Sequence, residues 1–155
     1  MERTALLTDY RNGYKKITEA MKNIPFELWD YKPSPEKWSV REILIHLADS
    51  EVNAFIRVRK MLAEPGSELM VYDQDKWAAA LNYASQDIDM SMMLFKTIRE
   101  SNYRLLVTLT DEEWGRSAFH PERGKMSLED WLLTYTSHVD KHIGQMFRTV
   151  ESAGK

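Results

Sequence analysis

The helical spacing of apolar residues is the feature that most constrains how this chain folds. In four long segments, apolar side chains recur every three or four residues, which places them along one face of a helix. No sustained stretch alternates apolar and polar residues as a half-buried strand would. The four segments are 3–22, 39–62, 87–109 and 127–152. Together they predict an all-α protein, a four-helix bundle.

Polar start signals and long connections divide these segments. Ser39 and Ser127 each open a capping pattern, "SVRE" and "SLED", at the start of a helix. The connections are 23–38, which contains three prolines, 64–86, in which we expect a short helix near 74–83, and 111–126, which we expect to be irregular. Connections this long are unusual in bundles and permit a crossover, so a simple up-down-up-down order is not assumed.

Length, composition and charge narrow the class of protein. With 155 residues, we expect one domain spanning 1–155. The chain has no cysteine, which excludes disulfides, thiolate metal ligands and a protein thiol nucleophile. Without a signal peptide or a run of about 18 apolar residues, the expectation is a cytoplasmic protein with no membrane partner. A formal charge of −3 argues against a nucleic-acid partner, and we interpret "RVRK" (57–60) as a solvated helix face.

Two of the four histidines lie four positions apart in the last helical segment. His138 and His142 fall on one shoulder of its apolar stripe, beside Trp131, where a side chain can line a groove between two helices. Imidazoles at positions i and i+4 can direct their nitrogens at one ion. The spacing alone leaves a metal site, a packing role and two solvated side chains as alternatives.

The other two histidines lie in different parts of the sequence, one in a predicted helix and one in a connection. His46 lies on a polar strip of the second segment with Ser50, Asn53 and Arg57, which is either a solvent face or the wall of a pocket that faces the histidine pair. As a pocket wall, His46 would complete a three-histidine site with an open position, and zinc, nickel and iron all accept imidazole ligands. His120, in "FHPERG", is expected to be a surface loop residue.

Two stretches resemble signature segments of a known family. "KWSVREILIHLADSE" (37–51) and "HVDKHIGQ" (138–145) are similar to those of the DinB superfamily, in particular its YfiT-like members, and "NAFIR" (53–57) and "YDQDKW" (72–77) add to the likeness. The resemblance implies a four-helix bundle in up-down-down-up order. It also implies that His46, His138 and His142 bind a metal ion, which is nickel or zinc in similar members.

What the resemblance implies about chemistry is less specific. Some members are S-transferases that use a low-molecular-weight thiol, others have no established reaction, and homodimers are common. The leading hypothesis is therefore a metal-dependent enzyme acting on a small molecule, either such a thiol S-transferase or a hydrolase. The alternative is a non-catalytic metal-binding or stress-response protein.

Four further side chains are candidates for a role in a reaction. Asn53 and Arg57, on the His46 strip, are candidates for orienting a polar or anionic group, or else solvated surface residues. Asp49 and Glu51 are candidate acid–base groups. Glu51 falls inside the apolar arc of its helix, so a buried salt bridge explains it equally well.

Overall fold

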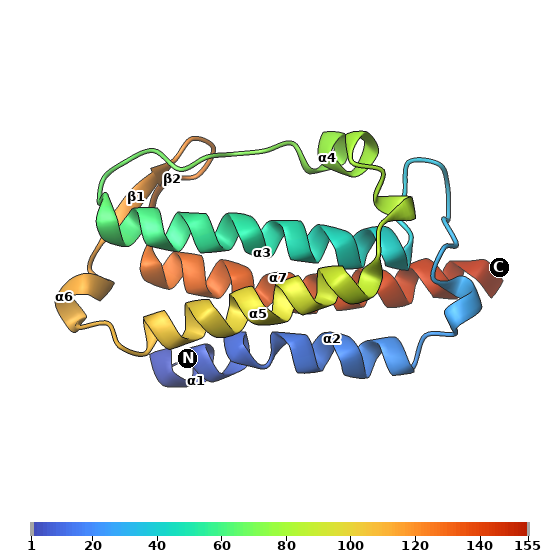
Figure 1. Ribbon diagram of the computed structural model, residues 1–155, viewed down its shortest axis with the longest axis horizontal. Helices are drawn as coiled ribbons and strands as arrows, with labels where there is room; N and C mark the ends of the chain where they lie inside the picture. The colour runs from blue at the N-terminus through green and yellow to red at the C-terminus, as the bar shows by residue number, and fades with distance from the viewer. Residues whose placement is uncertain (1, 155) are drawn as a thin grey trace.

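The computed structural model describes residues 2–154, and these form a bundle of long helices (Figure 1). The long helices are α1 (Arg3–Arg11) and α2 (Gly13–Lys22), which run almost end to end, α3 (Val40–Ala63), α5 (Ile88–Leu106) and α7 (Leu128–Glu151). The shorter elements are η1 (Phe26–Leu28), α4 (Gln74–Ala80), η2 (Tyr83–Ser85), α6 (Asp111–Trp114), β1 (Ser117–His120), β2 (Gly124–Ser127) and η3 (Ser152–Gly154). The all-α prediction is confirmed, since the sheet formed within residues 2–154 has two short strands.

The helices follow the up-down-down-up order (Figure 1). α1 and α2 run in one direction, α3 and α5 both run in the opposite direction, and α7 returns in the first direction. The connection between α3 and α5 therefore crosses the whole length of the bundle, with α4 on the way. Among the long helices, α3 contacts both α5 and α7, so its side chains reach the centre of the bundle.

The predicted helix starts are present as full capping boxes. The Ser39 side chain accepts from the Glu42 amide while Glu42 accepts from the Ser39 amide, and Ser127 and Asp130 do the same for α7. These reciprocal bonds satisfy amide groups that a helix start otherwise leaves unpaired. They fix where α3 and α7 begin, and hence which of their residues share a face.

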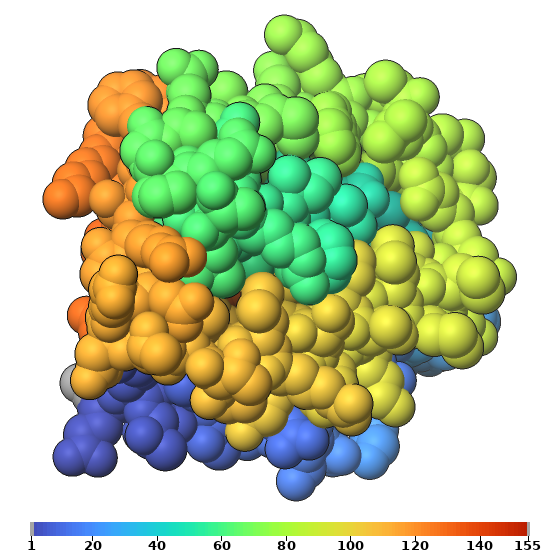
Figure 2. Space-filling view, turned by 60° about the vertical axis from the view of Figure 1, so that its left-hand side comes forward, coloured from blue at the N-terminus to red at the C-terminus, as the bar shows by residue number. Residues whose placement is uncertain are grey.

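The prediction of an irregular 111–126 connection was wrong. This region contains α6 and an antiparallel hairpin in which Ala118 pairs with Met126. Residues 66–69 add hydrogen bonds to β1, and Figure 2 shows the green segment and the orange hairpin side by side at this end of the molecule. Four-residue strands are too short to show a period-two pattern, and part of their pairing comes from a segment about 50 residues earlier, which local pattern reading cannot detect.

The first predicted helix, 3–22, is interrupted at Asn12, where the chain makes room for a buried arginine. Arg99 of α5 reaches into this break and donates a hydrogen bond to the Tyr10 carbonyl. A Cβ added at Gly13 would lie 1.9 Å from Nη1 of Arg99, so only glycine leaves the guanidinium its place. The interruption is therefore a consequence of tertiary packing.

The guanidinium of Arg99 joins three helices. It pairs with Glu51 of α3 at 2.9 Å and donates to the backbone carbonyl of Tyr135 in α7 at 2.6 Å. Arg99 and Glu51 are each 2% exposed, and the Tyr10 hydroxyl also contacts the Glu51 carboxylate. The interpretation of Glu51 as half of a buried salt bridge is thus confirmed.

Candidate metal centre

Three histidines from two helices converge at the interface between α3 and α7. Nε2 of His138 lies 3.3 Å from Nε2 of His46 and 2.9 Å from Nε2 of His142. One ligand nitrogen from each histidine lies within 4.8 Å of the other two. Periodicity left two interpretations of the His46 strip, and the structure turns His46 toward the pair on α7.

The local structure explains this convergence. His138 and His142 are one helical turn apart, so their side chains leave α7 on the same face. His46 is almost fully buried, and the ring of Trp38, just before the α3 N-cap, packs against its imidazole with 4.8 Å between centroids. The capping box at Ser39 therefore positions both the histidine and the aromatic ring that supports it.

The arrangement of nitrogens fits a divalent transition metal. Metal–nitrogen bonds of about 2.0–2.1 Å in tetrahedral geometry separate the ligand nitrogens by about 3.3 Å, close to the two distances observed here. Nδ1 of His142 lies 2.8 Å from Oε1 of Gln145, a hydrogen bond that assigns the proton to Nδ1 and leaves the Nε2 lone pair free. Zinc, nickel and iron all suit such a set of imidazole ligands.

Burial keeps the three imidazoles neutral. Desolvation is the main cause that lowers the pKa of His46 to about 3, of His138 to about 2 and of His142 to about 4. The charge of neighbouring histidines adds to the effect at His46 and His138, whereas the Gln145 hydrogen bond partly opposes it at His142. Because a metal binds only the neutral imidazole, the ligands are ready for an ion at neutral pH.

These lowered pKa values predict that the metal-free protein loses stability in acid. Below about pH 6.5 the unfolded chain takes up protons on these histidines, whereas the folded chain does not until the pH approaches its lower pKa values. From pH 6.5 to 5, each histidine should lower the free energy of unfolding by up to about 2 kcal/mol. Urea unfolding of metal-free protein at several pH values measures this slope.

The His138→Ala variant is the control for this slope. It should show a shallower loss of stability between pH 6.5 and 5, because one of the three groups is gone. Equal slopes for the variant and the parent protein would contradict the assignment of the acid sensitivity to this cluster.

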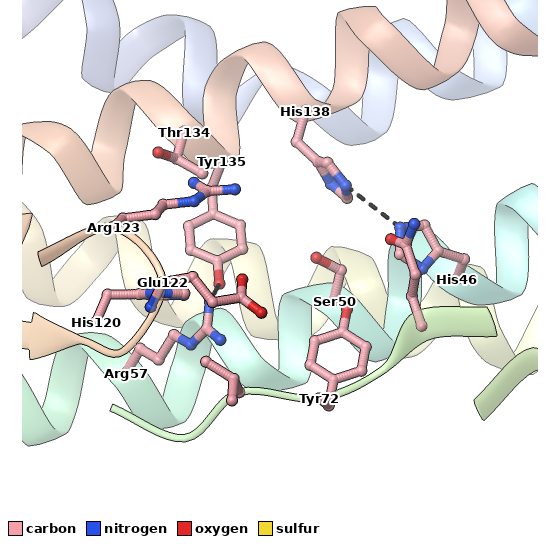
Figure 3. Close-up of a pocket in the computed structure, with 12 residues that line it drawn as sticks. His46, Ser50, Arg57, Tyr72, His120, Glu122, Arg123, Thr134, Tyr135 and His138 are labelled. Carbon is pink, nitrogen blue, oxygen red and sulfur yellow. Dashed lines mark hydrogen bonds between the residues drawn. The ribbon is translucent and has the colours of Figure 1, made fainter. Parts of the chain in front are cut away.

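A cavity of about 230 Å³ opens beside the histidines. Its walls come from α3, α7, the start of the α3–α5 crossover and the β1–β2 hairpin, and His46 and His138 line one part of it. Figure 3 shows Ser50 and Tyr72 next to these histidines, with Tyr135 and Arg57 further along. The predicted cluster therefore faces a space that a small molecule can enter.

Of the other four predicted site residues, one lines the cavity and three do not. Arg57 lines the cavity, whereas Asn53 is buried, donates to the Asp49 carbonyl and is not part of the cavity lining. The Asp49 carboxylate accepts a hydrogen bond from the Tyr83 hydroxyl, and Glu51 faces Arg99 in the core. The carboxylates of these two acid–base candidates are thus engaged with other partners.

The prediction that His120 is a surface loop residue was wrong. It lies on β1, is 3% exposed and lines the cavity, because the hairpin folds over this end of the α3–α7 groove. Sequence reasoning also missed Tyr135 and Arg123 as lining residues. Helical spacing places Tyr135 on the apolar stripe of its helix, and nothing in the local sequence of the hairpin indicates what the hairpin covers.

The fold and the cluster together define a helical-bundle protein with a candidate three-histidine metal centre at the wall of a cavity. The chain belongs to the DinB superfamily, whose sequence profile matches residues 10–146. None of the helices within residues 2–154 combines the length and the hydropathy that a transmembrane helix requires.

Two relatives that are similar in sequence to this chain are both described as putative metal-dependent hydrolases. A "putative metal-dependent hydrolase" of Oceanobacillus iheyensis is 26% identical over 91% of this chain and 84% of its own length. YfiT of Bacillus subtilis, which carries the same description, is 32% identical over 70% of this chain, and the alignment spans 62% of YfiT. The solved YfiT structure, reported to have an unusual four-helix-bundle topology, superposes with a TM-score of 0.89 over 99% of this chain and 90% of YfiT.

A more distant protein shares the fold. The crystal structure of a mycothiol-dependent maleylpyruvate isomerase superposes with a TM-score of 0.74 at 10% identity, over 94% of this chain and 61% of that one. At this level of identity the likeness concerns the arrangement of helices.

Proposed function

We propose that this protein is a metal-dependent enzyme that acts on a small molecule, with His46, His138 and His142 as the ligands of a divalent ion. The convergence of their three Nε2 atoms at the wall of a cavity carries the proposal. Zinc or nickel is the ion we expect, and iron is compatible with the same ligands. The protein itself would be one domain, and a homodimer is the expected assembly, which sedimentation velocity would test.

The side chains around the cluster favour transfer of a low-molecular-weight thiol. A bound divalent ion supplies Lewis acidity, which lowers the pKa of a coordinated thiol or water. The α3 carboxylates of Asp49 and Glu51 are held by Tyr83 and Arg99, and the carboxylate that does line the cavity, Glu122, comes from the hairpin at the arginine end (Figure 3). A thiol, with a pKa near 8.5, needs less help to ionise than water does. The chain has no cysteine, so the thiol must be a second substrate.

Hydrolysis is the second candidate, favoured by the description of the relatives as metal-dependent hydrolases. In either reaction the chain's own groups bind and orient the substrate. Tyr72 and Tyr135 offer hydroxyl groups along the cavity, and Arg57 offers a positive charge. Burial is the main cause that raises the pKa of Tyr135 to about 12, so its hydroxyl keeps its proton at neutral pH.

The test is turnover by protein loaded with zinc or nickel. We expect conjugation of monochlorobimane or an epoxide to glutathione, bacillithiol or cysteine, and we expect chelation or the His138→Ala substitution to abolish it. Hydrolysis of an ester or amide without a thiol would select the second candidate. If metal-loaded protein turns over none of these substrates, the non-catalytic metal-binding or stress-response alternative replaces the proposal.

A further inference from the structure

The cavity has two chemically different ends. In Figure 3, His46 and His138 lie together at one end, whereas Arg57, His120 and Arg123 gather at the other, beyond Tyr72 and Ser50. His46 and Arg57 are eleven residues apart on α3, a separation of about 16 Å along the helix axis. A ligand that spans the cavity would therefore meet the histidines with one end and the cationic residues with the other.

Arg57 brings a positive charge whose hydrogen-bond partners are neutral. Its Nε and Nη2 donate to the Met70 carbonyl at 3.1 and 2.6 Å, and its Nη1 donates to the Tyr135 hydroxyl at 3.1 Å. These bonds hold the guanidinium in place without neutralising it. They use three of its five N–H groups, so two remain for a ligand.

His120 adds a hydrogen-bond donor. Its Nδ1 accepts from the backbone amide of Glu122 at 3.2 Å, so the proton of the neutral ring is on Nε2. Burial and then the nearby charges of Arg57 and Arg123 lower the pKa of His120, which keeps the ring in this neutral form. The side chain is 3% exposed, and its Nε2–H is a donor held in a cavity wall.

The net charge of this end of the cavity would be neutralised by a ligand group with a single negative charge. Arg57 and Arg123 are cations, and Glu122, which also lines the cavity, is an anion, so one positive charge remains. A guanidinium pairs best with a planar, two-oxygen anion. A carboxylate has this shape and this charge, whereas a phosphate group carries more charge than the site offsets.

We infer that Arg57, His120 and Arg123 form a carboxylate-binding subsite, and that the substrate is a small molecule with a carboxylate at one end and its metal-directed group at the other. This inference rests on the proposed function for the role of the histidine end. The proposal for the carboxylate-binding end depends on the contacts of Arg57, His120 and Arg123 and does not require a bound metal.

The subsite can be tested first without metal. Hexanoate and hexanol, which differ in the carboxylate, are titrated into the metal-free full-length protein and followed by NMR of the histidine and arginine side chains. We expect hexanoate to bind about five- to tenfold more tightly than hexanol, since charge-assisted hydrogen bonds are the stronger kind. It should shift the resonances of His120 and Arg123. Equal affinities, or hexanoate shifts confined to His46 and His138, would overturn the inference.

Arg123→Gln provides the variant, because Arg123 is exposed and its loss should leave the fold intact. We expect it to reduce the preference for hexanoate at least threefold without changing hexanol binding. Lys125→Gln is the matched control, since Lys125 is an exposed cation of the same hairpin outside this cavity, and it should change neither affinity. An unchanged preference in Arg123→Gln would also overturn the inference.

Experiments on the zinc-loaded protein distinguish a failure of this inference from a failure of the proposed function. Calorimetry should show that 6-mercaptohexanoate binds more tightly than 6-mercaptohexanol, with the difference reduced in Arg123→Gln. If hexanoate is preferred but the protein does not bind zinc, the subsite stands and the proposed function fails. If zinc-loaded protein turns over a thiol or hydrolytic substrate but neither pair of ligands is distinguished, the proposed function stands and the carboxylate subsite fails.

Discussion

Alanine at any one of His46, His138 or His142 should raise the dissociation constant for zinc or nickel at least about 100-fold. Loss of residues that merely support a metal ligand already costs 10–100-fold, and here a ligand itself is removed. Helical content should remain, because the core of the bundle is built from apolar residues on the long helices. Metal analysis of protein made without a histidine tag, together with calorimetry and circular dichroism, measures both effects.

The stability of the metal-bound protein gives a second readout of the same change. At metal concentrations about 1,000 times the dissociation constant, binding should stabilise the parent protein by about 4 kcal/mol, or about 8–16 °C in Tm. At the same metal concentration, each variant, with a dissociation constant at least about 100-fold higher, should keep no more than about 1.4 kcal/mol of this gain. His120→Ala is the control and should keep it, since its imidazole is not part of the cluster. Normal metal binding by His46→Ala would remove α3 from the proposed site.

Glu51→Ala should strongly destabilise the fold. It would leave the Arg99 guanidinium buried without its counter-charge, and breaking a buried pair in this way costs about 3–5 kcal/mol. For a chain of this length, that corresponds to a fall in Tm of about 6–20 °C. Denaturant unfolding followed by circular dichroism gives the free energy.

Glu100→Ala is the matched control for this prediction. Glu100 pairs with Arg11 and Arg104 near the surface, where an ion pair contributes about 0–1 kcal/mol. A similar loss of stability in both variants would mean that burial does not set the importance of the Glu51–Arg99 pair.

The helices could be read from the sequence because the information is local. Apolar spacing and the polar starts at Ser39 and Ser127 act within one or two turns, and the helices observed begin and end close to the predicted positions. The resemblance to the DinB superfamily supplied what periodicity could not, the crossover order and the association of His46 with the pair on α7. From the residues alone, His46 had two equally good interpretations.

The tertiary structure decided the features that depend on contacts between distant segments. The break at Asn12 exists because Arg99, nearly 90 residues later, needs the space beside Gly13. His120 is buried because the hairpin packs against the crossover segment and over the groove between α3 and α7. No pattern within "FHPERG" indicates these contacts with distant segments. Spacing along a helix determines which side chains share a face, but only the packing of one helix against another determines what that face meets.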